Sequence, residues 1–82
     1  MKITFHDKEL ELKCDLREFM IYERLNNGHI FTGEDAEEYV KLFYSSIIRA
    51  LGYQPPVDDF LEFIESNEDA FVEFLNENFN DN

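Results

Sequence analysis

The spacing of apolar residues changes once along this chain, and that change limits the secondary structure it can form. Residues 2–5 (KITF) and 10–13 (LELK) alternate polar and apolar side chains, whereas from residue 16 onward apolar side chains recur every three or four positions. Period two is typical of a half-buried strand, and the longer spacing is typical of an amphipathic helix. The sequence therefore predicts a β-hairpin over 2–13 followed by about four α-helices. This is a mostly helical α+β fold in a single domain spanning 1–82.

The four residues HDKE between the alternating segments suit a tight turn. With residues 7–8 at the centre of that turn, Phe5 lies opposite Leu10, and Ile3 lies opposite Leu12. The four apolar side chains then share one face of the hairpin, and we expect this face to be buried.

Signals for helix ends divide the rest of the chain. Asp15 followed by Glu18 has the pattern of a capping box, in which two side chains satisfy the first free N–H groups of a helix. Pro56 can open a later helix, and Ser66 with Asp69 resembles a second capping box that separates the last two helices. The expected helices cover about 15–26, 34–51, 57–65 and 67–78.

Each predicted helix carries an apolar stripe that needs covering. The first helix groups Leu16, Phe19, Met20 and Glu23 on one side, with Ile21, Tyr22 and Leu25 on an adjacent edge. The stripe of the longest helix, which we expect to be central, consists of Ala36, Tyr39, Val40, Phe43, Ile47, Ala50 and Leu51. Outside that stripe the same helix has three further apolar residues, Leu42, Tyr44 and Ile48. The third helix has a short stripe of Val57, Phe60, Leu61 and Ile64.

The formal net charge of −12 at pH 7 is unevenly distributed. Residues 1–49 carry seven basic and ten acidic side chains, whereas residues 50–82 carry nine acidic side chains and no basic one. Nucleic-acid binding depends on neutralising phosphates with Lys and Arg, and anionic membranes attract basic segments. We therefore expect no nucleic-acid partner and no membrane partner. The charge favours a basic protein partner, or simply solubility, because excess acidic charge keeps copies of the chain apart.

No residue pattern supports catalysis or metal binding. Cys14 is the only cysteine, and neither His6 nor His29 has a partner at a catalytic spacing. The acidic segments lack the ligand spacing and central glycine of a calcium-binding loop. We expect a non-enzymatic protein with no catalytic residues, no metal and no cofactor. No signal peptide and no apolar run of about 20 residues is present, so we expect a soluble, cytoplasmic protein.

Five phenylalanines lie among eight acidic side chains in residues 58–79. Phenylalanines at helical spacing are usually core residues, and acidic neighbours are usually the solvated face. Some apolar residues nevertheless fall outside the main stripes, and surplus apolar surface on a small domain indicates a groove or an interface between copies. Both interpretations stay open. The candidate residues for binding a partner or a second copy are Phe63, Phe71, Phe74, Phe79, Tyr44 and Ile48.

Several short motifs recur in one known family. The chain opens with KITFHDKELELK, continues with Leu-Arg at 16–17, Tyr-Glu at 22–23, and Gly28 followed by Phe31, and then carries LFYSSIIRAL before an acidic tail. In this order of motifs the chain resembles the small tail assembly chaperones encoded by tailed bacteriophages and prophages. The resemblance covers the organisation of the whole chain.

The resemblance implies a role in assembly. Such chaperones bind the long, hydrophobic tape measure protein and keep it soluble until tail tube subunits polymerise around it. Several copies coat one tape measure chain. For this chain the resemblance implies that apolar helix faces hold the client, while the acidic exterior keeps the complexes apart.

A second hypothesis is a mimic of nucleic acid that blocks the basic cleft of a host defence protein. Such a mimic needs exposed carboxylates in rows with a spacing like that of phosphates, and its binding should weaken steeply with salt. The residues that could form such a row are Glu62, Glu65, Glu68, Asp69 and Glu73.

Overall fold

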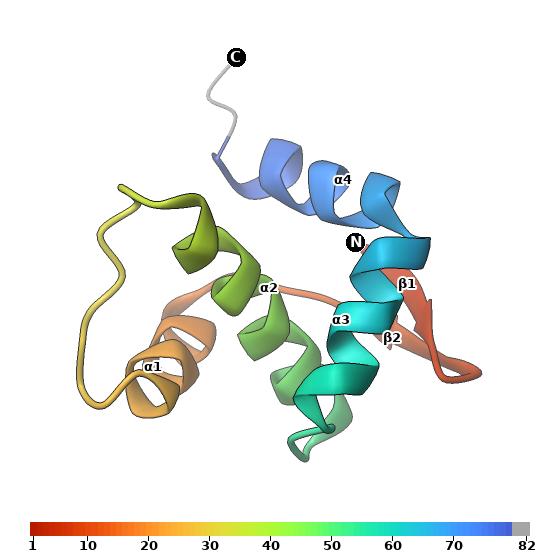
Figure 1. Cartoon of the computed structure of the whole chain (residues 1–82), viewed down its shortest axis with the longest axis horizontal. Coiled ribbons are helices and arrows are strands. Elements are labelled where there is room, and N and C mark those ends of the chain that lie inside the picture. Colours follow the sequence, from red (N-terminus) through yellow and green to blue (C-terminus); the bar gives the residue numbers. More distant parts are fainter. Residues whose placement is uncertain (80–82) are drawn as a thin grey trace.

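A computed structural model describes residues 1–79. Two strands, β1 (Lys2–Phe5) and β2 (Lys8–Glu11), precede four helices: α1 (Leu16–Leu25), α2 (Ala36–Leu51), α3 (Val57–Ser66) and α4 (Glu68–Phe79) (Figure 1). These residues form one compact domain, and 61% of them are helical. The predicted α+β fold class is therefore confirmed, and each predicted helix end lies within two residues of the observed one.

The buried face of the hairpin was predicted correctly, but the pairing of its strands was not. Ile3 lies opposite Leu10 rather than Leu12, and Phe5 lies opposite Lys8. All four expected side chains are nevertheless buried, because a shift of two residues leaves every side chain on its original face.

The turn explains the shift in register. The loop consists of His6 and Asp7, with φ angles of 47° and 65°. A two-residue loop with both residues in the left-handed region matches the twist of the strands. His and Asp adopt that region more readily than most residues, so the turn forms one residue earlier than a turn centred on Asp7 and Lys8.

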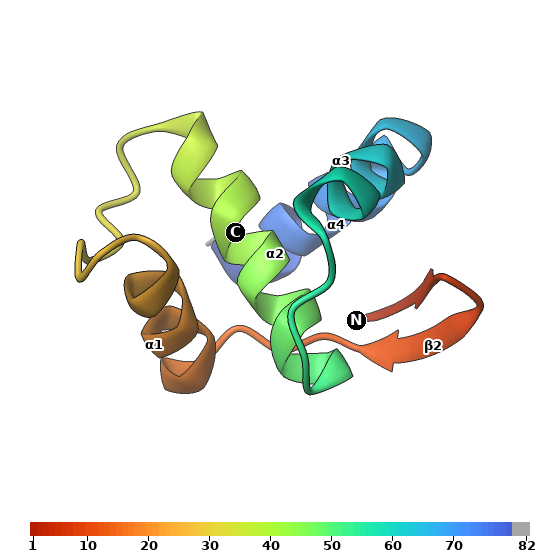
Figure 2. The same cartoon turned by 60° about the horizontal axis from the view of Figure 1, so that its bottom comes forward.

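Helix α2 crosses the middle of the molecule, with α1 on one side and the hairpin, α3 and α4 on the other (Figure 2). Leu42, Phe43 and Ile47 are completely buried, and so are Ser45 and Ser46. Leu42 was expected outside the main apolar stripe. It is buried because α2 contacts neighbours on more than one side, including α1, β2 and α4. The prediction that this helix is central is confirmed.

Helix α1 faces the core with a different side from the one that apolar spacing indicated. Glu18 and Tyr22 are buried, whereas Leu16 and Met20 are exposed. The predicted capping box is present: the Asp15 N–H donates to Glu18 Oε1 at 3.1 Å, and the Asp15 side chain accepts from Arg17. Glu18 is therefore buried while it accepts the Asp15 N–H, and Tyr22, one turn later on the same side of α1, is buried with it.

The break between α3 and α4 lies at Asn67 and not at a cap formed by Ser66. Ser66 is the last residue of α3, and the Asn67 N–H donates to Ile64 O. The Asn67 side-chain amide also donates to Phe63 O at 2.9 Å, and the backbone carbonyl of Asn67 accepts the Ala70 N–H. Asn67 thus ends one helix and starts the next, so both helices turn their phenylalanines toward α2.

The loop between α1 and α2 is held by the carboxylate of Glu38. This carboxylate accepts hydrogen bonds from the Thr32 N–H (2.9 Å), the Thr32 hydroxyl (2.7 Å), the Glu34 N–H (3.0 Å) and the Asp35 N–H (3.1 Å). The bonds from Thr32 contribute most, and together the donors lower the pKa of Glu38 to about 2. An ionised Glu38 therefore stabilises the path of the loop.

We expect Glu38→Gln to reduce the loss of stability on acidification. Because the folded state lowers the pKa of Glu38 below its ordinary value of 4.5, its contribution is present above that pH and is lost as the pH falls toward 2. Burial raises the pKa of Glu18, which acts in the opposite direction. Between pH 6 and pH 2 the unfolding temperature of Glu38→Gln should fall less steeply than that of the wild type. Glu34→Gln, the control, should follow the wild-type profile. Parallel profiles for wild type and Glu38→Gln would contradict the prediction.

Candidate protein-binding groove

The described residues offer little for catalysis. Among residues 1–79 there is no cluster of three or more His, Cys, Asp or Glu side chains placed to bind a metal ion. Burial, together with the nearby charges of Glu18 and Asp15, raises the pKa of Cys14 to about 11, so its thiol stays protonated at neutral pH and is a poor nucleophile. Within the same range, no helix is both long and apolar enough to cross a membrane.

Three of the six predicted binding residues surround Phe43 in the core. The ring of Phe74 is completely buried, 5.0 Å from the Phe43 ring centroid, and Phe63 is buried at 6.3 Å. Phe71 is half-buried at 5.5 Å from the same ring. In this fold these side chains close the core between α2 and the two last helices and do not form an exposed surface.

Phe79 belongs to a second aromatic cluster. It is half-buried at the end of α4, with its ring 5.1 Å from that of Tyr39 and 5.8 Å from that of Phe31. The contact ties the end of α4 to α2 and to the loop that follows α1. Phe79 therefore also serves to join elements of the fold.

The other two predicted residues, Tyr44 and Ile48, lie on a different side of α2. The Tyr44 ring lies tilted against Phe60, with the ring centroids 4.5 Å apart, and its hydroxyl donates to Pro55 O. Tyr44 is largely buried, and Ile48 is half-buried. Both side chains line hollows between α1, α2 and α3.

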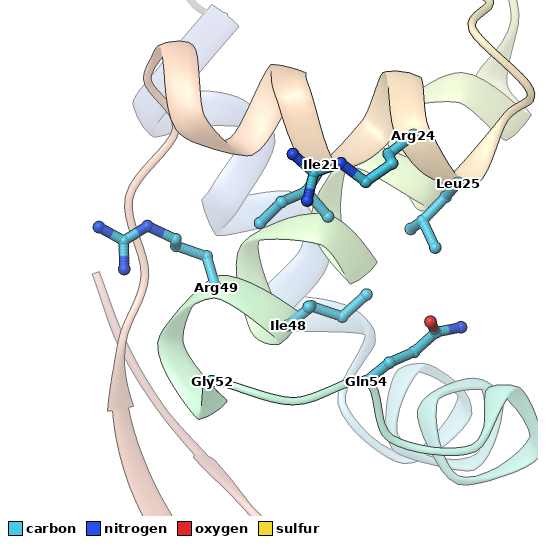
Figure 3. A pocket seen from close by; sticks show the side chains of 7 residues that line it. All are labelled: Ile21, Arg24, Leu25, Ile48, Arg49, Gly52 and Gln54. Atoms are coloured by element: carbon cyan, nitrogen blue, oxygen red, sulfur yellow. The ribbon is translucent and has the colours of Figure 1, made fainter.

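Two adjoining hollows form one groove, which we call the central groove. Their volumes are about 500 and 390 Å³, and they share Leu25 and Gln54. Figure 3 shows the first of these hollows, with Ile21 and Leu25 of α1 on one side and Ile48 of α2 with Gly52 and Gln54 on the other. Its apolar lining consists of Ile21, Leu25, Val40, Tyr44, Ile48, Val57, Phe60 and Leu61.

Helix α3 contributes the most exposed apolar residues of the central groove. Val57 is 51% exposed and Leu61 is 43% exposed, and the two are one helical turn apart. Both share an apolar stripe in the sequence with Phe60, which is buried. Because the spacing of all three is that of ordinary core residues, no signal in the sequence separates Val57 and Leu61 from Phe60.

The central groove has charged side chains at both ends. Arg24 and Arg49 line the hollow near the ends of α1 and α2, and Glu37 and Lys41 line the hollow near the start of α2. Glu37 and Lys41 form an ion pair at 3.1 Å. Within residues 1–79, neither Arg24 nor Arg49 lies within 4.0 Å of a carboxylate.

The carboxylates proposed for mimicry of nucleic acid are all exposed, on α3 (Glu62, Glu65) and on α4 (Glu68, Asp69, Glu73). Glu65, Glu68 and Asp69 gather at the corner where the two helices meet. The helix break at Asn67 interrupts a continuous row along one axis.

Comparison with known proteins adds no relative. No protein family, no curated protein and no solved structure matches this chain.

Proposed function

We propose that this protein is a non-enzymatic chaperone that holds an apolar helical segment of a client protein in the central groove. The observation that carries the proposal is the exposure of Val57 and Leu61 beside the half-buried Val40 and Ile48. An apolar groove between helices that leaves such side chains uncovered is a common site for an amphipathic helix. Residues at helical spacing on the client would replace water on these side chains.

The client we propose is the tape measure protein of a bacteriophage tail, in the cytoplasm of a bacterial host. The order of hairpin, short helix, long helix and acidic helical tail agrees with the resemblance noted in the sequence. The charge agrees as well, because eight acidic side chains and no basic one lie on residues 58–79. Complexes coated with such surfaces repel each other, which keeps an apolar client dispersed.

The test is a substitution that adds a charge inside the groove. We expect Leu61→Asp to weaken client binding about ten- to a hundredfold, because a buried apolar anchor contributes roughly 1–3 kcal/mol to binding. Both partners are co-expressed, the soluble client is quantified, and affinity is measured on purified complexes.

The matched control is Val72→Asp, which adds the same charge at a 52% exposed position on α4, outside the central groove. Both variants should unfold at nearly the wild-type temperature. Binding of both variants with the wild-type affinity would remove the central groove from the proposal. Equal loss in both would indicate a general effect of charge.

The exposure of the acidic side chains on α3 and α4 favours mimicry of nucleic acid as the second candidate. The two candidates differ in the surface that they use. Binding to a basic cleft would be insensitive to Leu61→Asp and would weaken steeply with added salt. Binding of an apolar helix in the central groove would be weakened by Leu61→Asp and would depend little on added salt.

A further inference from the structure

We propose that copies of this chain associate through the outer side of α1 in one copy and the outer side of α3 in the next. The two sides carry the same pattern of apolar residues, with charges of opposite sign beside them. On α1 this pattern forms what we call the basic face, which consists of Leu16, Arg17, Met20 and Arg24. On α3 it forms the acidic face, which consists of Val57, Asp58, Leu61 and Glu65.

The two faces have the same spacing of residues. Each helix has 10 residues, and each face uses the first, second, fifth and ninth positions of its helix. With 3.6 residues per turn, these positions lie within an arc of about 100° around the helix. Two apolar side chains therefore occupy one edge of each face, and two charged side chains occupy the other edge.

The fold leaves both faces uncovered. Leu16 is 74% exposed and Met20 is 48% exposed, and on α3 the apolar residues Val57 and Leu61 are 51% and 43% exposed. The charged side chains of both faces are exposed as well. Because α1 and α3 lie on different sides of α2 (Figure 2), the faces of one copy do not cover each other. A single exposed apolar residue needs no explanation, but a pair one turn apart on each of two helices marks an interaction surface.

The charges of the two faces form no ion pairs within the chain. Among residues 1–79, neither arginine of the basic face lies within 4.0 Å of a carboxylate, and neither carboxylate of the acidic face lies that close to a basic side chain. The carboxylate of Asp15 is near the basic face, but it accepts the backbone N–H of Arg17 as part of the helix cap. Glu23, which borders the apolar edge, is half-buried. The charges of both faces thus remain available to a second molecule.

The two faces complement each other when the helices run in opposite directions. Because both faces use the same positions, the charged edge lies on the same rotational side of the apolar edge in each helix. The charged edges of two such helices meet only in an antiparallel pair. Arg17 then lies near Glu65 and Arg24 lies near Asp58, with apolar side chains between the two ion pairs. Complementary charges of this kind determine the register and direction of an interface.

The net charge of the chain restricts how its copies meet. At a net charge of −12, neighbouring copies repel each other. Contact is therefore favoured only where charges of opposite sign face each other, and pairing of the basic face with the acidic face meets that condition. Because the paired faces are different, the contact continues from copy to copy, or it closes as a two-fold dimer when two copies form both contacts at once.

The acidic face overlaps with the central groove. Val57 and Leu61 belong to both surfaces, so a client helix and a second copy compete for these side chains. Association between copies covers part of the groove when no client is present. The inference does not rest on the proposed function, because the exposure and the charges of the two faces do not involve a client.

The experiment reverses the charges of one face at a time. Arg17→Glu/Arg24→Glu makes both faces of a copy acidic, and Asp58→Arg/Glu65→Arg makes both faces basic. The matched control, Lys2→Glu/Lys8→Glu, reverses two exposed charges on the hairpin. Sedimentation equilibrium of the full-length proteins at constant ionic strength, without a client, measures the dissociation constant. Protein concentrations from about 10 μM to about 1 mM cover the affinity of a small interface.

We expect the wild type to associate and each face variant to associate at least about tenfold more weakly, because like charges then face each other. An equimolar mixture of the two face variants should restore association, because each acidic face again meets a basic one. The hairpin control should keep the association of the wild type. Net charge alone predicts a different result, because Asp58→Arg/Glu65→Arg makes the chain less negative and would strengthen its association.

Four outcomes would overturn the inference. A wild type that stays monomeric over the whole range would do so, and it would leave the proposed function intact because no client is present. Stronger association of Asp58→Arg/Glu65→Arg than of the wild type would show that net charge governs the contact. A mixture of the face variants that stays monomeric, or a hairpin control that no longer associates, would exclude the pairing of these faces. Circular dichroism checks folding, and a mixture of Arg17→Glu with Glu65→Arg repeats the test if a double variant does not fold.

Discussion

Phe74→Ala is expected to lower the free energy of unfolding by about 3–5 kcal/mol, the range measured for removal of a buried phenylalanine. Phe74 is completely buried, and its ring lies against Phe43 at the centre of α2. Its removal leaves a cavity where α4 meets α2. A domain of this size has about 4–12 kcal/mol of stability in total, so the variant should be close to unfolding at physiological temperature.

Urea unfolding followed by circular dichroism measures this change. The control is Val72→Ala on the same helix, which should change the stability by no more than about 0.5 kcal/mol because Val72 is exposed. The comparison also decides the role of the tail. A change below about 1 kcal/mol in Phe74→Ala, combined with weaker client binding, would contradict a core role and would mean that α4 detaches from the domain.

Phe31→Ala is expected to lower the free energy of unfolding by about 2–3 kcal/mol, less than Phe74→Ala because Phe31 is only half-buried. Its ring lies 5.4 Å from Phe19, 5.6 Å from Tyr22, 5.2 Å from Tyr39 and 5.8 Å from Phe79. The first three of these pairs are edge-to-face, an arrangement that contributes beyond the area that the rings bury. One side chain of the loop thus links α1, α2 and α4.

The neighbouring Ile30 provides the control. It is 67% exposed, so Ile30→Ala should leave the stability nearly unchanged. Hydrogen exchange of the amides in residues 26–35 adds a local measurement, because loss of the Phe31 ring should increase exchange there before the whole domain unfolds. Equal stability of the two variants would show that the aromatic cluster does not hold the loop.

The ends of the helices were largely predictable because local residues determine them. Asp15 and Glu18 cap α1 through hydrogen bonds that involve only the first turn of the helix. Gly52 ends α2 with a φ of 84°, which glycine adopts without strain. Pro56 precedes α3 as expected. The break between α3 and α4 was predicted at Ser66 but lies at Asn67. Local residues did not separate the two positions, because Ser and Asn are both found at helix ends.

The candidate site was only partly predictable. Tyr44 and Ile48 were selected because they lie outside the main apolar stripe of α2, and both line the central groove. The phenylalanines of the tail were candidates because they lie among so many acidic side chains; in the structure Phe63 and Phe74 are buried, and Phe71 and Phe79 are half-buried. Val57 and Leu61 were overlooked because their spacing is that of ordinary core residues. An apolar stripe indicates that a helix face needs a partner, but it does not say which element covers it or how completely.

The sequence by itself determined the two strands, the four helices and the buried face of the hairpin. These features depend on periodicity, caps and turns, which involve residues only a few positions apart. Tertiary structure alone decided which apolar residues close the core, which line the central groove and which stay exposed on the outer side of α1. The physical reason is that these relations depend on how α1, α2 and α3 lie against one another, and packing between elements far apart in the chain leaves no local signal in the sequence.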